Sequence, residues 1–168
     1  MLVALCGCAT APESYSPPIQ RRAYTAEELS PVGAFVDMAD PNAEAYFIQG
    51  INSYLEGGSW RWTREKPELR FWLKTNRNLK FKCDFGIADA TFATTGPVTF
   101  SVYINGHLLS ETKCPKAAQY AVVKEVPAAW VKPGALNSVA LRVDKIFTAK
   151  SDGVKLGFVL YKAGFEVE

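Results

Sequence analysis

Polar and apolar side chains alternate along most of the chain after residue 68, and this two-residue period is the feature that most restricts the fold. In "PELRFWLK", Leu69, Phe71 and Leu73 share one face of an extended segment, and the intervening residues share the other. "NLKFKCDFGIA" repeats the pattern over residues 79–87. Each segment therefore predicts a β-strand with one buried face and one face open to solvent.

Further alternating segments follow and are separated by turn signals. "VTFSVYINGHLL" places an apolar residue at every second position of 98–104, before Asn105-Gly106, a pair that tolerates the positive φ angles of a tight hairpin. More strands are expected at about 107–113, 119–126, 138–147 and 154–165. Short strands joined by turns predict an all-β fold, an antiparallel jelly-roll-like β-sandwich of about eight strands.

The segment "VYINGHLL" and the later "EVPAAWVKPGALNSVALRVDK" together resemble part of the galactose-binding-domain-like β-sandwiches. In that family an Asn-Gly hairpin is followed by an apolar hook, a Lys-Pro-Gly turn and a strand that begins near Asn. Here the hook would be residues 126–131, with Trp130 filling the end of the core, and the strand would begin at Asn137. Residues 46–168 also look like jelly-roll domains found beside bacterial glycosyltransferases and in envelope proteins. The resemblance implies the fold more strongly than any one ligand.

The first residues, "MLVALCGCATAPE", contain a short apolar stretch that ends in Leu5-Cys6-Gly7-Cys8. This stretch resembles a bacterial lipobox, whose last cysteine receives diacylglycerol. The resemblance implies that residues 1–8 are the end of a truncated signal segment and that Cys8 is a lipid anchor. It also implies a lipoprotein of the bacterial cell envelope, on the outer membrane or the periplasmic face. The alternative is a disordered apolar tail.

Length and composition favour a single domain behind a tether. At 168 residues the chain can bury one core but not two. Residues 9–45 are rich in Pro, Ala, Ser and Glu and show no apolar period, so we expect a flexible linker there. The β-sandwich domain is then expected at 46–168.

Two cysteines fall within the expected sandwich. Cys83 and Cys114 could form one disulfide in an oxidising envelope compartment. In the alternative, Cys83 continues the apolar alternation and is a buried thiol. His107 is the only histidine and no paired-cysteine spacing occurs, so we expect no metal site and no cofactor.

One tryptophan is expected on the outer face of a strand. Trp72 has the opposite parity to the core residues of its strand and stands between Arg70 and Lys74. An indole can stack on the apolar face of a sugar while the basic groups donate hydrogen bonds to hydroxyls or acidic groups, so these three residues form a candidate glycan site. In the alternative interpretation, the long basic side chains simply cover the indole.

Charge and motifs narrow the class of function. A net charge of +2 with basic and acidic residues interspersed gives no basic stripe for nucleic acid. We expect a non-catalytic module that binds envelope polysaccharide or glycolipid, or alternatively an adaptor that docks another envelope protein. A glycoside-active enzyme is a distant third, for which Glu56 with Asp84 or Asp89 would supply the two carboxylates.

Overall fold

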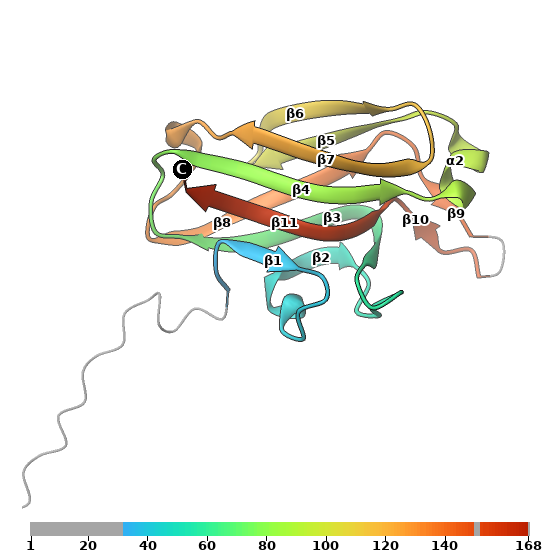
Figure 1. The fold of residues 1–168 in the computed structure, drawn as a ribbon, viewed down its shortest axis with the longest axis horizontal. Coiled ribbons are helices and arrows are strands. Elements are labelled where there is room, and N and C mark those ends of the chain that lie inside the picture. Colours follow the sequence, from blue (N-terminus) through green and yellow to red (C-terminus); the bar gives the residue numbers. More distant parts are fainter. Residues whose placement is uncertain (1–31, 150–151, 168) are drawn as a thin grey trace, which may run out of the picture.

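The alternating segments form β-strands that pair antiparallel in two packed layers (Figure 1). The computed structural model describes residues 32–149 and 152–167, so the predictions for Cys8, for residues 1–8 and for the linker up to residue 31 lie outside the described residues. No helix in the described part is long and apolar enough to cross a membrane. The predicted fold class, an all-β antiparallel sandwich, is confirmed, with eleven strands among the described residues.

The strands run in order as β1 (Phe35–Asp37), β2 (Phe47–Ile51), β3 (Arg61–Leu73), β4 (Leu79–Ile87), β5 (Val98–Ile104), β6 (His107–Cys114), β7 (Ala118–Glu125), β8 (Ala135–Val143), β9 (Phe147–Thr148), β10 (Lys155–Leu156) and β11 (Val159–Val167). Three short helical segments join them: η1 (Ala43–Tyr46), α2 (Asp89–Thr95) and η2 (Ala128–Trp130).

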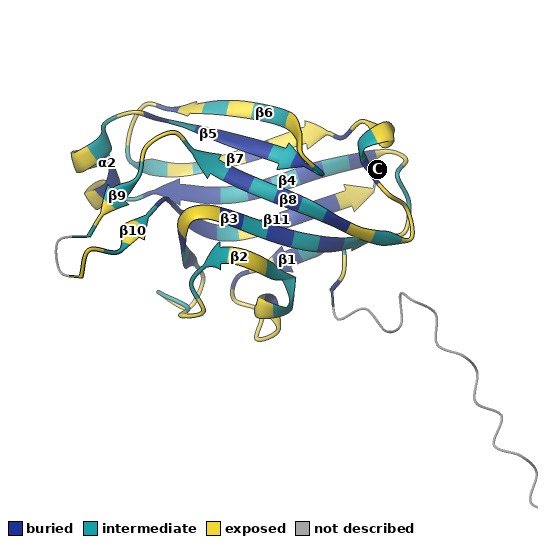
Figure 2. Ribbon diagram, turned by 180° about the vertical axis from the view of Figure 1, so that it is seen from behind, coloured by how far each residue is buried: buried dark blue, intermediate teal, exposed yellow. Residues whose placement is uncertain are grey.

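Two sheets make up the sandwich. The front sheet of Figure 1 has the order β1-β11-β4-β7, and the rear sheet, which faces the viewer in Figure 2, has the order β2-β3-β8-β5-β6. The start of β3 also pairs with β11, where Arg61 lies opposite Leu160, so the two layers are joined along one side. Strands β9 and β10 form a separate small hairpin.

Aromatic rings from both sheets fill the interior. Phe85 of β4 and Phe100 of β5 stack with ring centroids 3.8 Å apart, and Phe158 meets Phe100 edge to face at 5.0 Å. All three side chains are fully buried. Aromatic contacts of this kind add to the free energy that burial of apolar area supplies. The alternation predicted for residues 69–73 and 79–87 is confirmed, since every second residue there points into this core.

The hairpin predicted at Asn105-Gly106 is confirmed, but the role predicted for Trp130 is wrong. Asn105 and Gly106 have φ angles of 47° and 87° and connect β5 to β6. Trp130 is only half-buried, and the His107 ring stacks on it with centroids 5.0 Å apart. Val126 and Val131 close the core at this end instead. The smaller apolar residues of the hook fit between the sheets, and the large indole stays at the rim.

The folded domain begins earlier than the predicted boundary at residue 46. β1 pairs with β11, where Phe35 lies opposite Gly164, and Met38 just beyond it is fully buried. The buried Arg61 donates a hydrogen bond from Nε to the Met38 carbonyl oxygen at 3.1 Å. Residues 32–45 are therefore part of the sandwich and not of a linker. The sequence pattern missed them because a three-residue strand shows no period.

The contact of β1 with β11 depends on a glycine. Gly164 has a φ of +152°, and a Cβ there would lie 2.4 Å from Phe35 Cα and 2.5 Å from the Ala34 carbonyl oxygen. We therefore predict that Gly164→Ala lowers the free energy of unfolding by roughly 2–3 kcal/mol in urea denaturation.

Gly58→Ala is the matched control for this substitution. Gly58 also has a positive φ, +68°, but a Cβ there would have no other atom within 4 Å, so only backbone strain of about 1 kcal/mol is expected. If both variants lowered the free energy of unfolding by the same amount, the close packing of β1 on β11 would be contradicted.

Candidate functional site

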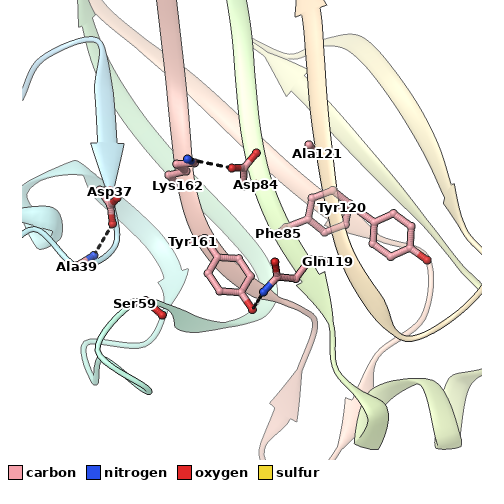
Figure 3. A pocket seen from close by; sticks show the side chains of 10 residues that line it. All are labelled: Asp37, Ala39, Ser59, Asp84, Phe85, Gln119, Tyr120, Ala121, Tyr161 and Lys162. Carbon is pink, nitrogen blue, oxygen red and sulfur yellow. Dashed lines mark hydrogen bonds and ion pairs between the residues drawn. The ribbon is translucent and has the colours of Figure 1, made fainter.

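A groove crosses the outer face of the front sheet, over β4, β7 and β11 (Figure 3). It consists of two adjoining hollows of about 480 Å³ and 280 Å³, both lined by Gln119 and Tyr161. We call it the Tyr161 groove. Its other side-chain walls come from Asp37, Ser59, Trp60, Asp84, Asp89 and Lys162. Strands and loops that are distant in sequence thus meet around one concave surface.

A bulge in β11 directs Tyr161 into the groove. Leu160 pairs with Phe85 and Lys162 pairs with Asp84, so Tyr161 is an extra residue with no partner on β4. A bulge of this kind reverses the side-chain alternation locally. Tyr161 and Lys162 therefore both reach the outer surface, while Leu160 stays fully buried.

A glycine makes room for the tyrosine ring. A Cβ on Gly86 would lie 2.8 Å from Val159 Cγ2 and 3.4 Å from Tyr161 Cε2. The ring thus lies across a part of β4 that has no side chain. Gln119, on β7 opposite Gly86, donates a hydrogen bond from Nε2 to the Tyr161 hydroxyl at 3.0 Å, as Figure 3 shows. This bond fixes the ring and leaves Gln119 one N–H and its carbonyl oxygen for other partners.

A loop before β3 supplies the second aromatic wall. Trp60 pairs with Glu56 in a short bridge that closes the loop, and its indole packs edge to face on Trp62 with centroids 5.9 Å apart. A Cβ on Gly57 would lie 3.0 Å from Trp60 Nε1, so the loop backbone also contacts the indole closely. Trp60 and Tyr161 line the same hollow. Two rings at one concave site can contact the apolar face of a ligand.

Ionisable side chains line the groove as well. Asp84 and Lys162 form a salt bridge with 3.1 Å between Oδ2 and Nζ. Asp37 Oδ1 accepts a hydrogen bond from the Ala39 amide at 2.9 Å, which holds that carboxylate at the rim. Asp89 begins α2 and lines the far hollow. Within residues 32–149 and 152–167, no group of three or more metal-ligating side chains occurs.

The carboxylates considered for a glycosidase come from three different elements, β4, α2 and the loop before β3. Asp84 and Asp89 line the two hollows of the groove, but Asp84 is engaged by Lys162. Glu56 lies in the loop that carries Trp60.

Trp72, Arg70 and Lys74 lie on the opposite side of the molecule from the Tyr161 groove. The parity predicted for Arg70 and Trp72 is confirmed, since both point outward from β3 in the rear sheet, and Lys74 comes directly after the end of that strand. Trp72 is half-buried and lies opposite Leu136 of β8. Arg70 donates a hydrogen bond from Nε to the Ala45 carbonyl oxygen at 2.9 Å, and Lys74 is exposed. Their role in binding a glycan stays a prediction.

The sequence interpretation missed Gly86, Gln119 and Tyr161. A signal for two of them was present in the pattern. In "VLYKAGF" the apolar positions Leu160 and Ala163 are three residues apart, which breaks the two-residue period and indicates a bulge. Gly86 leaves an outward position of its strand without a side chain, as expected where another group approaches the backbone closely. Nothing in the pattern around Gln119 distinguishes it.

Both cysteines of the sandwich are free, so the disulfide considered from the sequence is not present. Cys83 and Cys114 are fully buried on β4 and β6. Burial, with a smaller contribution from the charge of Asp144, raises the pKa of the Cys114 thiol to about 11. Burial and, to a lesser extent, Asp84 raise the pKa of Cys83 well above its ordinary value. Both sulfurs therefore stay protonated at neutral pH.

We predict that iodoacetamide at pH 8 leaves Cys83 and Cys114 unmodified in the folded protein and modifies both in urea. The thiolate is the reactive form, and burial both keeps the thiol protonated and keeps the reagent away from it. Peptide mapping by mass spectrometry separates these two residues from Cys6 and Cys8. Rapid modification of either residue in the folded protein, or a linked peptide containing both, would contradict the structure.

Comparisons with known proteins find distant similarities to solved structures. No protein-family model and no curated protein matches it. Among solved structures, an exo-β-1,3-galactanase from Phanerochaete chrysosporium is 12% identical with a TM-score of 0.43, and the match covers 80% of this chain and 29% of that one. The CBM51-2 and INT domains of ZmpB from Clostridium perfringens, in complex with GlcNAc, are 19% identical with a TM-score of 0.39, covering 80% and 28%.

A third structure is a single domain. The CBM36-1 domain of a multidomain xylanase from the hindgut metagenome of Trinervitermes trinervoides is 11% identical with a TM-score of 0.37, and the match covers 77% of this chain and 94% of that one. By contrast, the chain spans less than a third of the length of the first structures it matches, 29%, 32% and 19%.

Proposed function

We propose that this domain is a non-catalytic module that binds carbohydrate in the Tyr161 groove. The observation that carries the proposal is the pair of aromatic walls, Trp60 and Tyr161, at one hollow, with the amide of Gln119 between β7 and β11. The apolar faces of sugar rings pack on aromatic rings, and their hydroxyls both donate and accept hydrogen bonds. The groove offers partners for both kinds of contact.

Size and preorganisation support the same proposal. The larger hollow, about 480 Å³, falls within the range of roughly 300–1,000 Å³ that ligand sites occupy, and the adjoining hollow with both rings, about 280 Å³, lies just below it. The Tyr161 ring is held by Gln119 and by the space above Gly86, so little conformational entropy is lost when a ligand packs on it. The groove is open along the sheet, which suits part of a long polysaccharide better than an enclosed small molecule.

Trp72 with Arg70 and Lys74 is the other surface proposed to bind a glycan. Trp72 is partly exposed there, next to the exposed Leu136. One of the Arg70 donors is already used by the Ala45 carbonyl oxygen, which lowers the number of hydrogen bonds available to a sugar. The Tyr161 groove is therefore the better supported of the two sites.

The two sites can be separated by parallel substitutions. We predict that Trp60→Ala and Tyr161→Ala each weaken glycan binding about tenfold or more, which is about 1.4 kcal/mol, while Trp72→Ala leaves it unchanged. Glycan-array screening identifies the ligand and calorimetry measures the affinities. Thermal melting of each variant controls for folding.

The reverse result, in which only Trp72→Ala weakens binding, would move the site to the rear sheet. A lack of binding to every neutral and acidic glycan tested would argue against carbohydrate binding altogether.

We further propose that the module is held at the bacterial envelope by a lipid on Cys8. The support is the lipobox resemblance of Leu5-Cys6-Gly7-Cys8. Residues 9–31, which precede the described domain, would then be a spacer between the membrane and the module. A single acyl chain gives only marginal membrane binding, so stable attachment would need further acyl chains on the same cysteine.

The chain itself provides a matched control for the anchor. We predict that Cys8→Ala, in the protein produced from its native gene, moves the protein from the membrane fraction to the soluble fraction and abolishes labelling by palmitate. Cys6→Ala should leave both unchanged, because only the last lipobox cysteine is acylated. Equal behaviour of the two variants would refute the assignment of Cys8.

Docking to another envelope protein is the second candidate function. Two leucines of the rear sheet favour it, Leu108 and Leu136, which are 45% and 46% exposed. Capture from detergent-solubilised membranes distinguishes the two functions, since a stoichiometric protein partner would favour docking.

A further inference from the structure

We infer that the Tyr161 groove selects its ligand by charge, binding amino sugars more tightly than neutral sugars and neutral sugars more tightly than uronic acids. This inference rests on the proposed carbohydrate-binding function and narrows it to a class of ligand. It follows from the ionisable side chains that line the groove: three aspartates and one lysine.

The single lysine does not provide a positive site for a ligand. Lys162 Nζ lies 3.1 Å from Asp84 Oδ2, so its charge is already compensated. A ligand carboxylate would have to displace Asp84 to bind it and would leave that carboxylate without a partner. Farther along the same face, Lys82 and Glu166 form another compensated pair at 2.5 Å.

The remaining two carboxylates lie toward different ends of the groove. Asp37 lines the first hollow and Asp89 lines the second. Among the residues that the structure describes, no salt bridge reaches either of them. Once the Asp84 and Lys162 charges cancel, the groove keeps a net negative charge at both hollows.

Coulomb interactions with these carboxylates set the expected order of affinity. A protonated amine on a sugar is attracted, and a uronate carboxylate is repelled. The groove is open to solvent, so water and salt weaken both effects. We therefore expect steps of severalfold, and not of many orders of magnitude, between the three classes of ligand.

Three oligosaccharides of equal length test this order with the full chain. Oligomers of glucosamine and of N-acetylglucosamine differ only in the N-acetyl group that removes the amine's charge, and an oligomer containing glucuronic acid carries the opposite charge. Calorimetry is done at pH 6, below the ordinary pKa of an amine, so that most of the sugar amines are protonated. We expect the order amino, neutral, uronic, and we expect the preference for the amino oligomer to shrink in 0.5 M salt.

Substitutions then assign the selectivity to the groove. Asp37→Asn keeps an oxygen that can accept the Ala39 hydrogen bond while it removes the charge. We expect this variant and Asp89→Asn each to reduce the ratio of amino to neutral affinity about two- to fivefold. Lys162→Gln should increase the ratio, because it leaves Asp84 uncompensated.

Glu111→Gln is the matched control. It changes the net charge of the protein as Asp37→Asn does, but Glu111 lies on β6 in the rear sheet. Its affinity ratio should equal that of the unaltered chain. If the control shifts the ratio as much as Asp37→Asn, the selectivity comes from the whole protein and the inference is wrong.

The outcomes separate this inference from the proposal beneath it. Binding of all three oligomers with equal affinity, or tightest binding of the uronic one, would overturn charge selection and leave carbohydrate binding intact. No binding of any oligomer, and none across a wider glycan array, would overturn both. The salt dependence in the unaltered chain tests the inference even if a variant fails to fold.

Discussion

The two sheets hold together because every second side chain of their central strands enters one shared interior. Phe85, Phe100 and Phe158 meet there with ring centroids between 3.8 and 5.8 Å apart. A slip of one residue in β4 or β5 would turn such rings to solvent and charged groups inward, so the register of each strand is fixed by this packing. The outward residues are not needed for the core. They are free to form a binding surface.

The groove exists where this regular alternation is interrupted. A regular β11 would turn either Tyr161 or Lys162 toward the interior, but the bulge lets both face outward while Leu160 and Ala163 stay buried. Gly86 interrupts β4 at the neighbouring position and removes the side chain that would collide with Val159 and the Tyr161 ring. Two local irregularities, both at the pairing of β4 with β11, thus produce the concavity without disturbing the core beneath.

The features of the fold and of the groove that the sequence predicts are those determined by residues close together in the chain. Features that depend on contacts between distant segments could not be predicted. The parity of Phe71 against Trp72, and the turn at Asn105-Gly106, follow from local period and local φ preference, and the structure has both. β1 could not be predicted, because its three residues are held by β11 at the far end of the chain. The meeting of Trp60 with Tyr161 has the same origin. It depends on how the sheets close, which a local pattern does not determine.

The contrast between the two outer faces is the reason that we propose the front sheet, and not the rear sheet, as the glycan-binding surface. On the rear sheet, two carbonyl oxygens of residues 33–45 contact β3. The Gly33 carbonyl oxygen accepts a hydrogen bond from the Trp72 backbone amide, and the Ala45 carbonyl oxygen accepts one from Arg70 Nε. Polar groups near Trp72 are therefore partly satisfied by the chain itself. On the front sheet, the Gln119 amide is satisfied by Tyr161 through only one of its N–H groups. Because unused donors and acceptors beside aromatic rings are what a sugar can bind, the surface beside Tyr161 suits a sugar better than the surface beside Trp72.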